Sequence, residues 1–321
     1  MIITFTANPS IDATMCIDSL DPGGVLRVSE SSREPGGKGI NVSNAVLKAG
    51  QDTLAIAPAA DNDPFTALAR SAGIPLRTVP VDGAVRTNTT VTESSGRTTK
   101  LNEPGTTLTD DVRRTLETEL VDAASHPLTR AAVLAGSLPP GAPADWYPQL
   151  VAALRDAAPD LLIAVDTSDE PLKELGRKLE ATAPDVVKPN AFELGQLAGI
   201  DGGELESQAD DGDLDAVVKA AAALVDKGVR EVLVTLGGAG ACLVTVDGAW
   251  HAATPPAQVR STVGAGDSSL AGYILARLDG KDFPAALRTA VAYGTAAAAS
   301  PGTAIPSPDD IDYDRTTVRE L

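Results

Sequence analysis

The sequence predicts an α/β fold, a three-layer α/β/α sandwich with a mostly parallel central sheet and a small β-sheet lid. Short apolar runs alternate with longer segments of helical periodicity through most of the 321 residues, which is typical of consecutive strand–helix–strand units. Two stretches, at about 12–34 and 75–102, alternate in polarity without a helical period. Hydrophobic residues make up 43% of the chain, enough for a large core, and no linker divides it. We therefore expect a single domain over residues 1–321.

The expected elements follow one another in chain order. Each strand is a short apolar run, as a strand buried on both faces requires, and each helix carries apolar residues at a period near 3.6. Strands are expected at 2–6, 53–58, 131–135, 161–166, 186–187, 231–236 and 242–246, and helices at 38–49, 63–72, 109–122, 145–157, 267–278 and 283–299. The acidic segment 201–213 is expected to be a solvated loop.

The stretches 12–34 and 75–102 are rich in Thr, Val, Ser and Arg. Their alternating polarity predicts strands of one antiparallel flap, which would serve as the lid. An exposed sheet face favours pairing with a second copy. A homodimer through the lid sheets is therefore expected.

The charge balance excludes a general nucleic-acid-binding surface. The chain has 26 Lys+Arg against 44 Asp+Glu and a formal net charge of −18, whereas binding to phosphate backbones needs clustered cations. No apolar run approaches the length of a membrane span, and residues 1–5 carry no basic targeting segment. We expect no nucleic-acid or membrane partner and a cytoplasmic location.

The kind of acidic residue predicts adaptation to salt. Asp outnumbers Glu by 30 to 14 and Arg outnumbers Lys by 17 to 9, a bias typical of proteins from the salt-loaded cytoplasm of halophilic archaea. Because salt screens repulsion among surface carboxylates, we expect the melting temperature to rise between low and molar KCl. Thermal melts across a KCl series test this. A melting temperature independent of salt would indicate an ordinary acidic protein.

The cysteines and histidines do not form a recognisable site. Cys16 and Cys242 are far apart in the sequence, and His126 and His251 are isolated. A disulfide framework, a zinc site and a Ser-His-Asp triad are therefore not expected.

One glycine-rich motif, Gly264-Ala265-Gly266-Asp267, comes immediately before an expected helix. Glycine allows a tight turn, so that backbone N–H groups converge at a helix N-terminus, where anions are stabilised. A carboxylate beside such an anion hole can accept a proton from a hydroxyl that attacks a phosphoryl group. The alternative is that Asp267 only caps the helix.

A second cluster, Gly36-Gly37-Lys38-Gly39 with Asn41, also precedes a helix. It offers close backbone approach, a cation and an amide for hydroxyl or phosphate oxygens. It is neither a Walker loop nor GxGxxG. Alone, it would be read as a glycine turn with an exposed lysine.

Further polar loops follow predicted strands, and the carboxyl ends of parallel strands are where α/β folds bind ligands. These loops are Asn8–Asp12, Ala135–Gly141, Lys188–Leu194 and Thr235–Gly240. We expect all of them to meet at one edge of the sheet.

In this order and spacing, the motifs resemble the ribokinase-like sugar kinases, in particular the phosphofructokinase B family. The resemblance runs from Asn8 to Gly302. It implies that Asp267 is the general base and that Gly264, Ala265 and Gly266 form the anion hole. It also implies ATP with Mg²⁺, and a monovalent cation such as K⁺ near the loop after Arg260 and residues 297–302.

The resemblance assigns the remaining site residues by position. Those expected to bind the sugar or its phosphate are Asp12, Arg27, Gly36, Gly37, Lys38, Asn41, Arg86, Asn88, Lys100 and Ser137. Those expected to bind the nucleotide are Lys188, Asn190, Glu193, Thr235, Gly237, Gly240, Thr262 and Ser300, with Glu193 holding Mg²⁺ through water. The alternative for Arg27 and Lys100 is a solvated charge on a strand. The alternative for Glu193 is a carboxylate in the first turn of a helix.

A cluster of cations in an acidic chain suits a substrate that itself carries a phosphate. Asn8–Asp12 and Leu101–Gly105 are most similar to the branch of the family that acts on fructose 1-phosphate or tagatose 6-phosphate. We expect ATP-dependent phosphorylation of fructose 1-phosphate in fructose catabolism, with fructose 6-phosphate and tagatose 6-phosphate as alternatives. From other classes, a non-catalytic sugar-binding regulator and a dinucleotide-dependent oxidoreductase are disfavoured, because the base and anion hole are intact and GxGxxG is absent.

Overall fold

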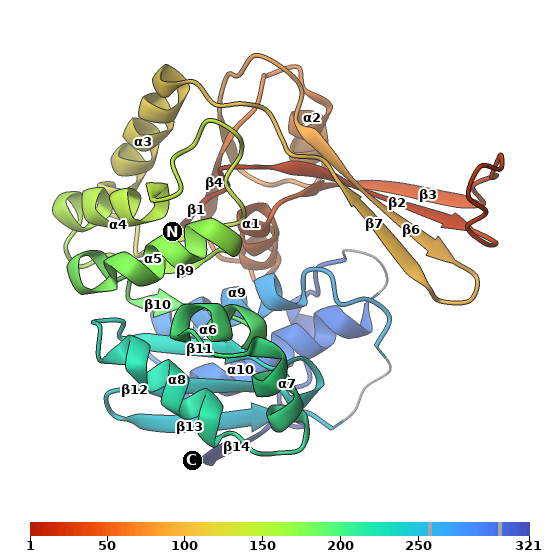
Figure 1. Cartoon of the computed structure of the whole chain (residues 1–321). Coiled ribbons are helices and arrows are strands. Elements are labelled where there is room, and N and C mark those ends of the chain that lie inside the picture. Colours follow the sequence, from red (N-terminus) through yellow and green to blue (C-terminus); the bar gives the residue numbers. More distant parts are fainter. Residues whose placement is uncertain (256–258, 301–303) are drawn as a thin grey trace.

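The computed structural model describes residues 1–255, 259–300 and 304–321. Within them, a ten-stranded sheet forms the centre of the molecule (Figure 1). From one edge to the other, its strands are β14 (Thr317–Glu320), β13 (Gly248–Ala253), β12 (Ala241–Thr245), β11 (Glu231–Thr235), β10 (Val186–Val187), β9 (Leu162–Asp166), β8 (Ala131–Ala135), β1 (Ile2–Phe5), β4 (Thr53–Pro58) and β5 (Leu76–Val79). Strands β11 to β5 in this order run parallel, and β12, β13 and β14 add an antiparallel edge.

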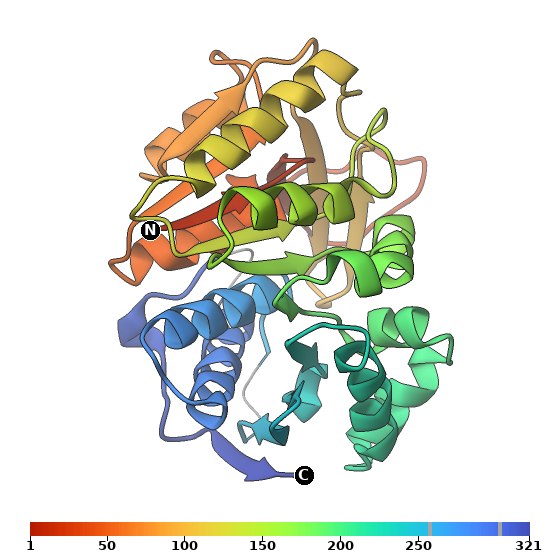
Figure 2. The ribbon, with the colours of Figure 1, turned by 90° about the vertical axis from the view of Figure 1, so that its left-hand side faces the viewer.

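Helices cover both faces of this sheet (Figure 2). One face packs against α3 (Asp110–Ala124), α4 (Trp146–Ala157), α5 (Asp169–Thr182), α6 (Ala191–Ala198), α7 (Gly202–Asp210) and α8 (Asp215–Val225). The other packs against α1 (Lys38–Lys48), α2 (Pro64–Ser71), α9 (Ala265–Leu278) and α10 (Phe283–Ala299). Short 3₁₀ turns η1 (Gly237–Ala239) and η2 (Pro308–Asp310) lie between elements. The three-layer α/β/α sandwich is confirmed.

The interior strands read as continuous apolar runs because each is buried on both faces. All five residues of β8 are buried, with successive side chains entering opposite helical layers: Ala132 and Leu134 pack into one and Val133 into the other. Polar residues are therefore confined to the strand ends. The sheet brings those ends, and the loops that follow them, to one edge.

The lid is a separate four-stranded sheet that projects from the body (Figure 1). Its strands, in order across the sheet, are β3 (Glu30–Gly36), β2 (Ser10–Ile17), β6 (Arg86–Glu93) and β7 (Thr98–Asn102). Two expectations about it were wrong. The lid is mixed, because β2 and β6 pair in parallel, which the long crossover between them permits. Residues 76–79 also form a strand, but β5 extends the central sheet beside β4.

The expectation of a solvated loop at 201–213 was wrong as well. Residues 202–210 form helix α7, which begins at Asp201, whose carboxylate accepts hydrogen bonds from the backbone N–H groups of Gly203 and Glu204. Leu205 and Ala209 are buried one turn apart. Because only this narrow face is apolar, the acidic residues around it obscured the helical periodicity of the sequence.

No helix among the described residues is long and apolar enough to cross a membrane.

Candidate active site

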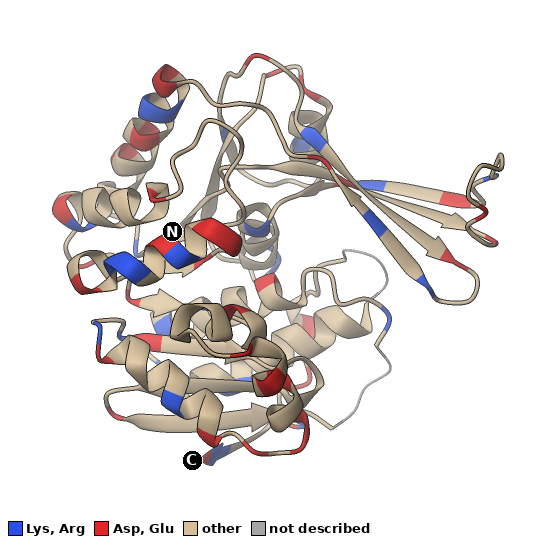
Figure 3. Ribbon diagram, in the orientation of Figure 1, with Lys and Arg blue, Asp and Glu red and all other residues tan. Residues whose placement is uncertain are grey.

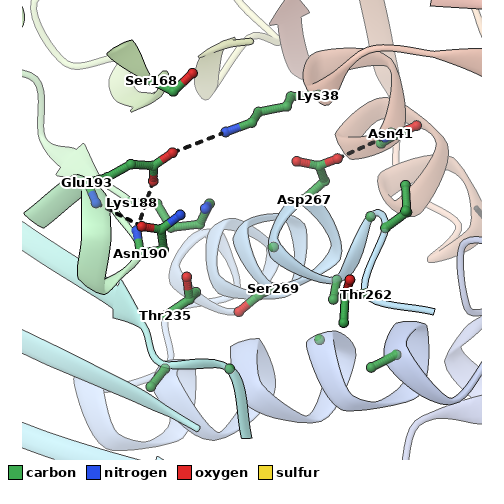
Figure 4. Close-up of a pocket in the computed structure, with 18 of the residues that line it drawn as sticks. Lys38, Asn41, Ser168, Lys188, Asn190, Glu193, Thr235, Thr262, Asp267 and Ser269 are labelled. Carbon is green, nitrogen blue, oxygen red and sulfur yellow. Dashed lines mark hydrogen bonds and ion pairs between the residues drawn. The ribbon is translucent and has the colours of Figure 1, made fainter. Parts of the chain in front are cut away.

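A cavity of about 1130 Å³ lies between the lid and the carboxyl edge of the central sheet. The loops after β1, β8, β9, β10 and β11 all line it, together with the N-termini of α1 and α9 and the inner face of the lid. The expectation that these loops gather at one edge is confirmed. The side chains that converge there come from both halves of the chain (Figure 4).

The N-terminus of α9 opens into the cavity. Gly264 precedes the helix with φ of +77°, a left-handed conformation that favours glycine, and no side chain caps the helix. Gly264, Ala265 and Gly266 all line the cavity. Uncapped N–H groups at a helix N-terminus bind anions, so this turn can hold a phosphoryl group.

Asp267 follows in the first turn of α9 and is 7% exposed. The Nδ2 of Asn41, on α1, donates a hydrogen bond to its Oδ2 at 2.8 Å (Figure 4). This contact joins two motifs that lie 226 residues apart in the sequence. The carboxylate of Asp267 faces the cavity rather than serving as a helix cap.

The surroundings of Asp267 raise its pKa to about 6, chiefly because burial disfavours the charged form and the carboxylate of Asp166 is nearby. Lys38, Asn41 and Lys188 act in the opposite direction. A carboxylate with this pKa is ionised at neutral pH and is a better proton acceptor than an ordinary aspartate.

Asp166, at the end of β9, is the central anion of a buried charge cluster. Its Oδ1 lies 2.7 Å from Nζ of Lys38, and its Oδ2 lies 3.0 Å from Nζ of Lys188. Burial alone would raise the pKa of Asp166, but these two cations hold it below its ordinary value. The sequence interpretation gave Asp166 no role of its own.

Lys38 points toward Asp166 and Glu193, not toward Arg86 and Ser137. Besides its contact with Asp166, its Nζ lies 4.0 Å from Oε1 of Glu193 on α6 (Figure 4). Burial alone would lower the pKa of Lys38, but the carboxylates of Asp166, Glu193 and Asp267 raise it, so the side chain stays charged. Lys188 is 4% exposed and packs beside Gly266, at the anion hole.

Asn190 and Glu193 form a capping box at the start of α6. The Oδ1 of Asn190 accepts from the N–H of Glu193 at 2.8 Å, and Oε2 of Glu193 accepts from the N–H of Asn190 at 2.8 Å. Glu193 is therefore also a carboxylate in the first turn of a helix, which was the alternative considered from the sequence. Its second oxygen remains on the cavity side, facing Lys38.

These residues fit a magnesium ion held mainly by phosphates and water. Glu193 has one carboxylate oxygen not engaged in the capping box, and the described residues contain no cluster of three His, Cys, Asp or Glu that would hold a metal alone. Mg²⁺ commonly binds through one or two carboxylates plus phosphate oxygens.

The lid presents a row of polar side chains to the cavity. Asp12 on β2, Asn88 on β6 and Asn102 on β7 are directly in register across three strands. Asp12 accepts hydrogen bonds from Ser10 at 2.7 Å and from Asn88 at 3.3 Å. Burial raises the pKa of Asp12 despite these two bonds. The Oδ1 of Asn88 is buried without a partner among the described residues, so it can accept from a ligand hydroxyl.

A corner suited to phosphate lies where the lid meets the body. The guanidinium of Arg86 donates to the carbonyls of Glu103 at 2.9 Å and Asn8 at 3.2 Å, and approaches Oγ of Ser137 at 3.5 Å. Asn8 also donates to Ser137, at 3.3 Å. Arg86 and Ser137 thus converge at the cavity wall, and Nε of Arg86 is buried without a partner among the described residues.

The opposite end of the cavity is lined by small residues. Thr235 ends β11, Gly237 and Gly240 come from the turn after it, Thr262 precedes α9, and the C-terminal part of α10 forms the far wall. Little side-chain volume projects there, which leaves room for a flat, extended ligand.

Four of the predicted site residues do not line the cavity. Arg27 lies on an exposed segment between β2 and β3, and Lys100 lies on the cavity-facing side of β7 but beyond the cavity wall. Gly36 packs directly against Asp12, with no room for a Cβ, and the hydroxyl of Ser300 donates to the carbonyl of Ala296.

Several polar residues near the cavity were not predicted as individual site residues. Those at or beside strand ends are Asn8, Ser10, Asn102, Asp166, Ser168 and Asp169. Their position at or just after the ends of strands was the available signal. Of the expected monovalent-cation segment 297–302, Pro301 and Gly302 lie outside the described residues.

An uncapped helix N-terminus with an adjacent buried carboxylate, facing the polar side chains of the lid, is typical of a phosphotransferase acting on a hydroxyl. The family model described as pfkB family carbohydrate kinase matches residues 6–310. The chain belongs to this family of sugar kinases, which use ATP with Mg²⁺.

The similar proteins include two activities. The chain is 34% identical to ATP-dependent 6-phosphofructokinase isozyme 2 of Escherichia coli over 313 residues, 96% of either chain. It is 36% identical to 1-phosphofructokinase of Xanthomonas campestris over 285 residues, 86% of this chain and 84% of that one.

Among solved structures, phosphofructokinase-2 of Escherichia coli in complex with substrates and products matches with a TM-score of 0.84 and 32% identity over 96% of each chain. That enzyme has also been crystallised in complex with potassium. Ribokinase of Thermotoga maritima, at 19% identity and a TM-score of 0.71 over 97% of each chain, shares the fold. The ribokinase-like fold expected from the sequence is thereby confirmed.

Proposed function

We propose that the protein is a 1-phosphofructokinase, which converts fructose 1-phosphate and ATP into fructose 1,6-bisphosphate and ADP, and that residues 1–321 act as one kinase domain. The observation that carries the proposal is the position of Asp267, between the open N-terminus of α9 and the sugar-sized subsite beneath the lid. The corner formed by Arg86 and Ser137 supports a substrate that already carries a phosphate.

In the proposed reaction, the chain orients the sugar and removes one proton. Asp12, Asn88 and Asn41 hold the sugar hydroxyls. Asp267 takes the proton from the 6-hydroxyl as that oxygen forms a bond to the γ-phosphorus, while the bond between the γ-phosphorus and the β,γ-bridging oxygen breaks and its electrons leave with ADP.

The cations of the chain stabilise the charge that develops during transfer. The N–H groups at Gly264–Gly266 receive the equatorial oxygens of the transferring group, and Lys38 and Lys188 supply positive charge on either side of Asp166. Glu193 and Asn190 would hold Mg²⁺ through water, and the ion would supply further charge neutralisation.

The lid provides both cover and a proposed contact with a second copy. Its inner face holds polar residues, whereas Leu101 on its outer face and Val25, Leu26 and Val28 beside it are exposed. We propose that these apolar residues mediate a homodimer, the arrangement expected from the sequence. Arg27 lies in the same segment. Phosphofructokinase-2 of Escherichia coli has a tetrameric inhibited form.

The substrate is tested by coupled assays with fructose 1-phosphate, fructose 6-phosphate and tagatose 6-phosphate at matched concentrations of ATP. The proposal expects the highest kcat/KM for fructose 1-phosphate. A preference for fructose 6-phosphate would assign the protein the activity of its Escherichia coli relative. Release of ADP without any phosphosugar product would exclude all three assignments.

Arg86→Met tests the phosphate corner. Losing a charge-assisted hydrogen bond worth about 2–3 kcal/mol is expected to raise KM for fructose 1-phosphate roughly 30- to 150-fold. The KM for ATP should stay within about twofold, because Arg86 lies at the other end of the cavity. Arg70→Met, at the exposed end of α2, is the control. Equal changes in both KM values would contradict the assignment.

A further inference from the structure

We propose that His251, on β13, is a positioning residue for the nucleotide: its imidazole fixes the glycine turn 237–240 in the shape that receives ATP. The inference rests on the proposed function, because it assumes that this end of the cavity binds the nucleotide. It assigns a role to one of the two isolated histidines of the chain.

The turn needs an anchor because of its composition. Three of its four residues are glycine, and Gly237 and Gly240 have φ of +56° and +92°. Glycine samples many backbone conformations, so a turn of this kind loses much entropy when it is fixed. Gly237, Gly238 and Gly240 line the cavity, so their backbone is presented directly to a ligand.

The backbone hydrogen bonds of the turn close it at the end of the β11–β12 hairpin, where Thr235 pairs with Ala241. The N–H of Leu236 donates to the carbonyl of Gly240 at 2.8 Å, and the N–H of Ala239 donates to the carbonyl of Leu236 at 3.0 Å. These bonds hold the two ends of the turn to β11 and β12. The carbonyl of Ala239, between those ends, is contacted from another strand.

His251 supplies the external contact. Its Nε2 lies 2.7 Å from the carbonyl oxygen of Ala239. A carbonyl oxygen can only accept, so Nε2 carries the proton and donates. Within residues 1–255, 259–300 and 304–321, no other side chain is hydrogen-bonded to residues 237–240.

The strand that carries His251 is paired on both sides, and it contacts the turn at a second point. β13 pairs on both sides, with His251 in register with Cys242 on β12 and with Arg319 on β14. A Cβ at Gly240 would come within 2.1 Å of the carbonyl oxygen of Ala252, so the turn ends in direct contact with β13. The hydrogen bond and this steric contact both hold the turn against β13.

Loss of the hydrogen bond is expected to weaken nucleotide binding specifically. If the turn occupies its binding conformation for a smaller fraction of time, the apparent dissociation constant rises in inverse proportion. One neutral hydrogen bond corresponds to about a tenfold change. The sugar and phosphate subsites share no hydrogen bond with this turn among the described residues, so their affinity should not change.

The test compares His251→Leu and His251→Gln with the wild-type protein. Calorimetric titration with ADP and Mg²⁺ measures binding without turnover, and steady-state assays give KM for ATP and for fructose 1-phosphate. His251→Leu should raise the ADP dissociation constant and the ATP KM about tenfold, with the KM for fructose 1-phosphate within about twofold. His251→Gln retains an N–H donor and should recover most of the loss. His126→Leu, at an exposed position away from the cavity, is the control.

Hydrogen exchange gives a readout that is independent of activity. The amides of residues 236–241 should exchange faster in His251→Leu, while those of β12 and α9 stay protected. Unchanged exchange and unchanged ADP affinity in a folded His251→Leu would overturn the inference and leave the proposed kinase intact. The inference would also be wrong if His251→Leu raised the KM equally for both substrates and lowered the melting temperature, and His251→Gln restored neither. His251 would then have only a structural role. Failure of the wild-type protein to bind ADP would overturn both proposals.

Discussion

Asp267→Asn is expected to lower kcat about a thousandfold, within the range of 10²–10⁴ that a positioned base contributes. Asparagine keeps the shape of the side chain but cannot take the proton of the sugar hydroxyl. The variant should fold and bind ADP with near wild-type affinity, because the glycine turn and Lys188 are unchanged. Steady-state kinetics and calorimetry measure the two effects.

The matched control is Asp279→Asn, at the exposed C-terminal end of the same helix. It removes an equal charge without touching the cavity. A kcat for Asp267→Asn within about threefold of wild type would refute the assignment of the base, whereas loss of ADP binding would assign Asp267 to the nucleotide instead.

The pKa of Asp267 also predicts how kcat/KM depends on pH. Because the pKa is about 6 and only the ionised carboxylate accepts a proton, kcat/KM should rise with pH through this region and level off above pH 7. The sign follows from burial, which disfavours the charged form and so extends the inactive, protonated state to higher pH. Asp267→Asn should lose this inflection. A profile that falls as pH rises through 6 would contradict it.

Lys38→Met is expected to lower kcat about a hundredfold while changing the KM for fructose 1-phosphate only a fewfold. The Nζ of Lys38 lies between Asp166 and Glu193, where the transferring phosphoryl group is expected, so its charge should matter most in the transition state. Steady-state kinetics with each substrate varied in turn separate the two constants.

Lys219→Met, on the exposed face of α8, is the control for removing a lysine. If Lys38→Met instead raised the KM for fructose 1-phosphate strongly and preserved kcat, Lys38 would bind the substrate phosphate. That is the role expected from the sequence. Because Asp166 keeps its contact with Lys188, the variant should remain folded.

The positions of the interior strands along the chain could be predicted because these strands are buried on both faces. Such burial forces a continuous apolar run, and the strands at 53–58 and 131–135 have the predicted bounds. The same topology made the gathering of the ligand loops predictable, since parallel strands end at one edge. Asn41 and Asp267 were both expected in the site, but the hydrogen bond between them was not predicted.

Other features depend on contacts that no local pattern encodes. Asp166 was visible as the end of a strand, but its ion pair with Lys38 joins residues 128 positions apart and arises only when α1 and β9 meet. A lysine side chain is long and flexible, so its place in a motif did not fix the end of the cavity to which it points. The parallel pairing of β2 with β6 likewise depends on tertiary crossing rather than on strand composition.

The charges of this protein fall into two populations with different environments. Those of outer helices such as α3 and α5 lie in solvent (Figure 3), whereas Asp166 and Lys188 are 1% and 4% exposed. Bulk ions reach the first population and hardly affect the second. Surface residues can therefore change in charge without altering the buried ion pair between Asp166 and Lys188.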